Sequence, residues 1–150
     1  MKRGFVLIII GFAIFSSLVL YNYLQAQSAI KDTRPSPLTI DLVSYPEVVK
    51  AGHTGTFIWR IEASPDLSTP STTIYWGYEA SPGALTKQDS PQAVGYPGFL
   101  PDYMSGSFGL PSSFDLNIKL TQPGQVFFRA YAKIKGDHLW TEEMSLKVEK

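Results

Sequence analysis

The sequence predicts an all-β fold, an antiparallel sandwich of about seven strands, preceded by one N-terminal transmembrane helix. Six segments between residues 38 and 148 alternate apolar with polar residues. This period of two is typical of strands that bury one face. Gly, Pro and Asp residues that favour turns separate these segments. The long apolar run of the chain comes before all of them, at residues 5–24.

The apolar run at residues 5–24 reads FVLIIIGFAIFSSLVLYNYL. A helix of this length spans about 30 Å, which is the thickness of the hydrocarbon core of a bilayer. Lys2 and Arg3 precede the run, and the positive-inside rule keeps such residues in the cytoplasm. We therefore expect residues 1–24 to be a single-pass anchor in the cell membrane. The lipid bilayer is its partner, the N-terminus is cytoplasmic and the C-terminal domain lies outside.

Two other interpretations of the N-terminus stay open. The stretch Ala26-Gln27-Ser28 before Ala29 could form a signal peptidase site, and cleavage there would release a secreted sandwich. The start at residues 2–5, Lys-Arg-Gly-Phe before an apolar run, resembles the N-termini of type IV pilin-like proteins. In that family a prepilin peptidase cuts after the glycine, so the resemblance implies a filament subunit. It covers about 25 residues and departs from the family at Ile9, where a glutamate is usual.

A polar stretch, QAQSAIKDTRPSP at residues 25–37, follows the apolar run. Its last part holds Pro35 and Pro37, which disfavour helix at the residues before them. We expect it to be a tether that joins the anchor to an extracytoplasmic domain at residues 38–150.

The alternating segments define the strands that we expect within that domain. The apolar side chains of Phe57, Trp59 and Ile61 share one face of their strand, which places Trp59 inside, between the two sheets. In the fifth segment Arg129 and Lys133 fall on the opposite face, where we expect solvent. The six segments are residues 38–42, 57–62, 73–79, 114–120, 126–134 and 143–148.

This domain resembles fibronectin type III and related immunoglobulin-like domains. The resemblance rests on Trp59 in the second strand, Tyr78 at the end of the third and the string LTQPGQVFFRAYA at residues 120–132. It departs from the family at Val126, where a tyrosine is usual. The strand order of the family requires residues 81–113 to cross the sandwich once. We expect residues 92–96, which lie between two prolines, to form a short edge strand on the way.

The long segment at residues 81–113 is also where we expect a partner, because long loops in compact domains often carry function. Its large aromatic rings and an acidic residue could hold a protein or a glycan. The alternative is that the rings fold inward and hold the loop on the sheet. The candidate residues are Tyr96, Phe99, Asp102, Tyr103 and Phe108.

Composition and motifs point away from catalysis and from cofactors. The chain has no Cys, and its 13 basic and 13 acidic residues balance, which disfavours nucleic-acid binding. We expect His53 and His138 to lie in turns at opposite poles and to share no metal. Glu142 and Glu143 are expected on opposite faces of a strand, so they would not act together as acid and base. The sequence thus predicts a non-catalytic protein with a binding or structural role at the cell surface.

Overall fold

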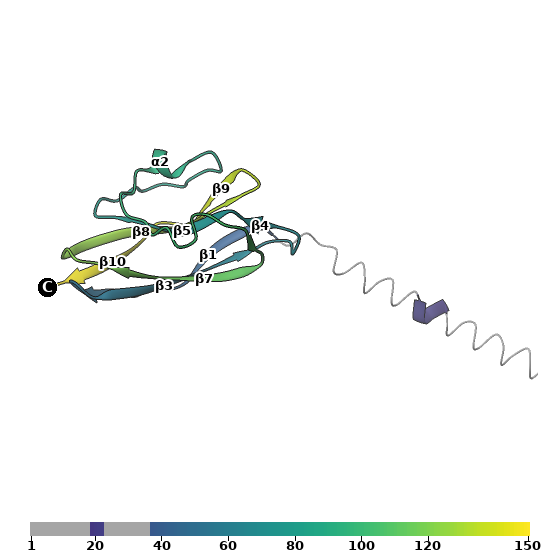
Figure 1. Cartoon of the computed structure of the whole chain (residues 1–150), viewed down its shortest axis with the longest axis horizontal. Coiled ribbons are helices and arrows are strands. Elements are labelled where there is room, and N and C mark those ends of the chain that lie inside the picture. The colour runs from purple at the N-terminus through teal and green to yellow at the C-terminus, as the bar shows by residue number, and fades with distance from the viewer. Residues whose placement is uncertain (1–18, 23–36) are drawn as a thin grey trace, which may run out of the picture. The chain divides into compact units, whose positions relative to one another are not determined.

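The computed structural model describes residues 19–22 and 37–150 (Figure 1). Most of the predicted anchor and tether lies outside the described residues. Residues 19–22 form a helical turn, and no helix in the described part of the chain is long and apolar enough to cross a membrane. The chain divides into two compact units, Met1–Pro35 and Ser36–Lys150. The second unit contains all the strands described below.

Strands dominate the second unit. The elements are β1 (Thr39–Ser44), β2 (Val48–Lys50), β3 (Thr54–Glu62), β4 (Ser68–Thr69), β5 (Ser71–Gly77), α2 (Pro91–Val94), β6 (Phe108–Gly109), β7 (Ser112–Lys119), β8 (Gly124–Ile134), β9 (Asp137–Trp140) and β10 (Met144–Glu149). The six predicted strands are confirmed as β1, β3, β5, β7, β8 and β10, with shifted ends, whereas the short strands β2, β4, β6 and β9 were not predicted.

Two sheets form the sandwich (Figure 1). The first sheet has the order β1-β3-β7, and the second has the order β2-β10-β8-β5 with β9 also paired to β8. The chain changes sheet between β1 and β2, so β2 runs parallel to β10, whereas the other pairs are antiparallel. This strand order is immunoglobulin-like, as the sequence predicted.

The core lies between the sheets, and Trp59 is buried in it as predicted, with 0% of its surface exposed. Its ring stacks on Phe114 at a centroid distance of 5.6 Å. Its Nε1 donates a hydrogen bond of 2.8 Å to Thr72 Oγ1, and that hydroxyl donates one of 2.6 Å to the carbonyl of Tyr131. The polar tip of the largest core ring is therefore satisfied without water.

The outer face of the second sheet is covered, which corrects the expectation that Arg129 faces solvent. Arg129 is only 2% exposed, and Thr73 and Tyr75 on the same face are also buried. The cause is the chain between β5 and β6, residues 78–107, which we call the cover segment. Figure 1 shows α2 and its flanking loops above β5 and β8. Lys133 is exposed, as expected.

The prediction of an edge strand at residues 92–96 is wrong, because most of these residues belong to the helical turn α2. Ser90 caps this turn by accepting a hydrogen bond from Ala93 N at 3.4 Å, and a proline occupies its start. The segment touches the edge of the second sheet slightly later, at Gly98. Gly98 and Trp76 exchange two backbone hydrogen bonds of 2.9 and 3.0 Å.

The predicted crossing of the sandwich is confirmed by backbone hydrogen bonds near the start of β5. Thr72 N donates to the carbonyl of Tyr103 at 2.9 Å, and Gly106 N donates to that of Pro70 at 3.1 Å. After Gly98 the cover segment therefore runs antiparallel to β5, from the end of that strand back to its start.

Candidate functional site: the covered face of the second sheet

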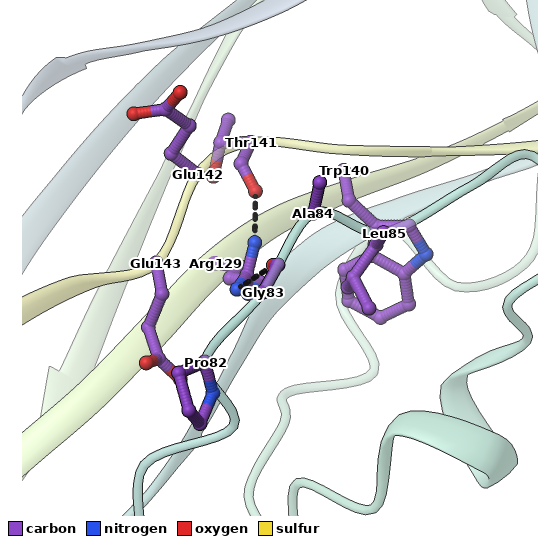
Figure 2. A pocket seen from close by; sticks show the side chains of 9 residues that line it. All are labelled: Pro82, Gly83, Ala84, Leu85, Arg129, Trp140, Thr141, Glu142 and Glu143. Carbon is purple, nitrogen blue, oxygen red and sulfur yellow. Dashed lines mark hydrogen bonds between the residues drawn. The ribbon is translucent and has the colours of Figure 1, made fainter.

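The buried guanidinium of Arg129 fastens the start of the cover segment to β8 (Figure 2). Its Nη2 donates to the carbonyls of Ser81 and Gly83 at 3.0 and 2.9 Å, and its Nη1 donates to that of Thr141 at 2.9 Å. Its Nε has no hydrogen-bond partner among the described residues. A buried cation is costly unless it is hydrogen-bonded, so these three carbonyls make the burial of Arg129 tolerable.

Glu143 fastens the same segment from the residue before β10. Its Oε1 accepts a hydrogen bond of 2.7 Å from Ser81 N and a second one from the hydroxyl of Tyr96. Tyr96 is 7% exposed. Burial, and then the neighbouring Glu143, raise the pKa of Tyr96 to about 12, although Arg129 acts in the opposite direction. The tyrosine therefore stays a neutral donor to Glu143 throughout the physiological pH range.

A second apolar cluster lies beneath the cover segment. Tyr75 and Tyr131 meet edge to face at 5.6 Å, and Trp140 lies 4.6 Å from Tyr131. Burial raises the pKa of Tyr131 to about 12, and it also raises the pKa of Tyr75. The cluster consists of Tyr75, Tyr96 and Tyr131, with Val94, Met104, Phe127 and Trp140 packed around them.

The β9 strand holds the middle of the cover segment. Trp140 Nε1 donates a hydrogen bond of 2.8 Å to the carbonyl of Asp89. His138 N donates one of 3.0 Å to the carbonyl of Lys87. The Lys87 ammonium also forms an exposed ion pair with Asp137 at 3.0 Å. The segment is thus bonded to β5 on one side and to β9 on the other.

An open pocket of about 450 Å³ remains between the start of the cover segment and the residues around β9 (Figure 2). Both Glu142 and Glu143 line it, but their carboxyl groups point in different directions (Figure 2), so only the expectation that they belong to a strand is wrong. Residues 141–143 belong to no strand, so alternation does not apply to them. Glu143 already accepts two hydrogen bonds, whereas Glu142 is exposed. The pocket is lined by Pro82, Gly83, Ala84, Leu85, Arg129, Trp140, Thr141, Glu142 and Glu143.

Three of the predicted partner-binding rings fold inward. Tyr96 belongs to the second cluster. Tyr103 is half-buried and meets Phe114 edge to face at 5.3 Å. Phe108 is also half-buried and lies 5.5 Å from Tyr103. Tyr103, near the end of the cover segment, and Phe108, in β6, pack against the main core.

The other two predicted residues, Phe99 and Asp102, are exposed. Phe99 is 46% exposed, and its ring is tilted against Tyr75 at 5.4 Å. Tyr75 also lies 5.5 Å from the half-buried Trp140. We call Phe99, Tyr75 and Trp140 the aromatic platform. The five predicted residues therefore do not form one surface. The aromatic platform contains one of them, Phe99, beside Tyr75 and Trp140, which were not predicted as partner contacts.

The two histidines have different surroundings. His53 is exposed in the turn between β2 and β3. His138 lies in β9 and not in a turn, and its Nδ1 is 2.8 Å from the hydroxyl of Tyr131. Within residues 19–22 and 37–150, no group of three His, Cys, Asp or Glu residues could hold a metal ion.

Comparison with known proteins gives no family for the chain, since no family model and no curated protein matches it. Solved structures share its architecture at low identity. A PKD domain of an M14-like peptidase from a Thermoplasmatales archaeon is 13% identical, with 78% of this chain and 98% of that chain covered and a TM-score of 0.49. A CARDB domain from Pyrococcus furiosus is also 13% identical, with 77% and 94% covered and a TM-score of 0.43.

A third similar structure is a superoxide reductase (neelaredoxin) from Ignicoccus hospitalis. It is 19% identical, with 77% of this chain and 83% of that chain covered and a TM-score of 0.41. The immunoglobulin-like fold of this chain is shown by the strand order of its two sheets.

Sequence reasoning missed Arg129, Trp140 and Glu143 as residues that fasten the cover segment. One signal was available, because β5 and β8 carry apolar or aromatic residues on both faces. Tyr75 and Tyr131 lie on the face that alternation assigns to solvent. Strands with large apolar residues on both faces indicate burial on both sides.

Proposed function

We propose that the chain is a membrane-anchored, non-catalytic binding module that displays its covered face outside the cytoplasm. The observation that carries the binding role is the aromatic platform. Phe99 stays 46% exposed although it lies within a segment that is bonded to the sheet on both sides. The anchoring part rests on the apolar run at residues 5–24 behind Lys2 and Arg3.

Rigidity supports the binding role. A ring that is held in place loses little conformational entropy when it meets a partner, so its contact area contributes more fully to affinity. Phe99 is restrained by its contact with Tyr75 and by the backbone pairing of the preceding Gly98. Loops on a rigid scaffold are also where binding residues concentrate.

The chemistry of the platform favours a sugar ring as the ligand. A pyranose presents an apolar face that can stack on Phe99 or Trp140, and hydroxyl groups that can donate to carboxylates. Two exposed carboxylates could accept these hydrogen bonds, Asp102 in the cover segment and Glu142 at the pocket. We therefore propose a glycan at this face, with a protein partner as the competing outcome of the experiment below.

The non-catalytic part of the proposal is supported by the state of Glu143. Glu143 Oε1 accepts hydrogen bonds from both Ser81 N and Tyr96, so this oxygen already serves the fold. Its role in the fold is to hold the cover segment.

The test of anchoring is the mass of the mature N-terminus, combined with protease treatment of intact cells. An intact Met1 or Lys2 and degradation of the domain by external protease are the expected results. A new N-terminus at Phe5 would instead support a pilin-like subunit, and one at Ala29 would support a secreted domain. A domain that is fully protected in intact cells would contradict the outside location.

The test of binding compares Phe99→Ala with Tyr78→Ala on a glycan array and in crosslinking to surface proteins. Tyr78 is the matched control, because it is 38% exposed but is not part of the aromatic platform. We expect Phe99→Ala to lose at least about tenfold in affinity, since burying one large apolar side chain contributes about 1.5–3 kcal/mol. We expect Tyr78→Ala to bind normally. Equal binding by both variants would contradict a role for the platform. If Phe99→Ala loses binding only to a surface protein and not to any glycan, the ligand of this face is a protein and not a glycan.

A further inference from the structure

The edges of the two sheets differ in how they are protected. An open edge presents unpaired backbone groups, so proteins usually shorten, bend or cover it. The strand order of the first sheet ends at β1 and β7, and that of the second sheet ends at β2 and β5. The β1 edge is bent by a register shift between Leu42 and Ser44, the β2 edge has three residues, and Gly98 pairs with the β5 edge.

The β7 edge has none of these protections within the described residues. It is 8 residues long and contains no proline, which gives a length of about 27 Å at the usual rise of a strand. Its register with β3 continues without a shift from Ser112 to Lys119. No backbone hydrogen bond other than those with β3 is made by these residues in the described part of the chain. One whole side of β7 is therefore available for another strand.

We propose that β7 of a second copy of this chain pairs with this edge, antiparallel and centred on Asn117. The two-fold axis would pass between the two Asn117 residues, perpendicular to the sheet. Such an axis keeps the core side of both sheets on the same face, and it would join them into one continuous sheet across the dimer. Asp115 of each copy would then lie opposite Lys119 of the other.

Charge complementarity favours this register over the registers centred on Asp115 or Lys119. Ser113, Asp115, Asn117 and Lys119 are all exposed on the outer face of β7. A dimer centred on Asp115 would place two carboxylates opposite each other, and one centred on Lys119 would oppose two ammonium groups. Directly opposed like charges destabilise a sheet, whereas opposite charges stabilise it. Centring on Asn117 instead creates two ion pairs at once.

This inference does not depend on the membrane anchor or on the aromatic platform, because β7 belongs to the sheet opposite the covered face. If the chains are anchored in one membrane, their effective concentration rises and pairing is favoured further. The proposal nevertheless concerns the edge alone, so failure of the proposed function would leave it standing.

The absence of cysteine from the chain allows a direct test by disulfide crosslinking. Asn117→Cys would place two thiols on the two-fold axis, where opposed residues have Cα atoms about 4.5–5.5 Å apart. That separation suits a disulfide. The matched control is Thr56→Cys, which is exposed and directly opposite Asn117 on β3. In the dimer its two copies would be three strand spacings apart, about 14 Å, which is too far to be bridged.

Both variants are oxidised as full-length chains in detergent, and the dimer is measured on a non-reducing gel. We expect Asn117→Cys to crosslink and Thr56→Cys to remain monomeric. Equal yields from the two variants would show random collision and would overturn the proposal. No crosslinking by either variant, in chains whose thermal unfolding matches that of the parent, would overturn it as well.

Charge exchange tests the register separately. Asp115→Lys alone, or Lys119→Asp alone, replaces both ion pairs with like-charge contacts, and we expect either change to weaken the dimer about tenfold in sedimentation equilibrium. The double variant Asp115→Lys with Lys119→Asp restores opposite charges, so it should dimerise like the parent. A parent chain that is monomeric up to its solubility limit, or a double variant no better than the single ones, would overturn the proposal.

Discussion

Tyr96 and Glu143 are joined by a hydrogen bond between side chains that are 47 residues apart in the sequence. Tyr96 lies in the cover segment, and Glu143 precedes the last strand of the second sheet. Together with Arg129 they convert an irregular, Gly- and Pro-containing segment into a fixed layer over that sheet. The covered face is thus held by polar contacts as well as by the tyrosine cluster beneath it.

The first prediction is a loss of stability at alkaline pH. The pKa values of Tyr96 and Tyr131 are raised from 10.0 to about 12. A folded-state pKa above the unfolded value favours folding at low pH, so this stabilisation is complete below about pH 10 and is lost as the pH rises through about 12. It amounts to at most about 3 kcal/mol for each tyrosine.

We expect Tyr96→Phe and Tyr131→Phe each to flatten the fall in unfolding free energy between pH 10 and 12, as measured by urea unfolding. Tyr78→Phe, at an exposed position, is the matched control and should leave the parent profile unchanged. Profiles that are identical for all three variants would contradict the burial of the two phenol groups.

The second prediction concerns Arg129→Lys and limited proteolysis. A lysine has one charged nitrogen and cannot span carbonyls on both sides of the pocket as the guanidinium does. The carbonyls of Ser81 and Gly83 would lose their donor, and the start of the cover segment would open more often. We expect cleavage within residues 78–90 at least about tenfold faster than in the parent. Lys133→Arg on the same strand, which is exposed, should not change the cleavage rate.

How far the structure could be predicted from the sequence depends on which surface a residue faces. Trp59 was placed correctly, because the main core buries one face of each strand and alternation reports that directly. Arg129 was misplaced, because what buries it is an irregular segment without any period. The inward direction of Tyr103 was only one of two open interpretations, since composition alone does not say whether a loop aromatic packs or binds.

The candidate site was less predictable than the strands for a related reason. Phe99 was singled out from the loop, but Tyr75 and Trp140 beside it come from β5 and β9. Their meeting depends on how the cover segment lies on the sheet, and no local pattern encodes that path. The helical turn α2 could have been anticipated, because Ser90 followed by a proline is a usual helix start.

The third prediction separates packing rings from exposed rings. Tyr103 contacts Trp59, Phe108 and Phe114, so Tyr103→Ala should lower the melting temperature by at least about 5 °C, as expected for a loss of about 1–2 kcal/mol in a domain of this size. Phe99→Ala should lower it by no more than about 2 °C. Thermal unfolding followed by circular dichroism measures both. If Tyr103→Ala left the melting temperature unchanged, the ring would not be a packing residue and would again be a candidate partner contact.

The fourth prediction uses two glycines as a matched pair. A Cβ atom added at Gly98 would lie 2.3 Å from the ring of Trp76, whereas one added at Gly109 would meet nothing within 4 Å. The backbone of Gly98 and the indole of Trp76 must therefore separate in Gly98→Ala, which breaks the pairing that covers the edge of β5. We expect Gly98→Ala to cost about 1–3 kcal/mol, the usual range for overpacking, and to speed amide exchange at Gly98 and Trp76. Gly109→Ala should change neither quantity. If Gly98→Ala were as stable as Gly109→Ala, the close contact between the cover segment and Trp76 would be wrong, and the path assigned to that segment would have to be redrawn.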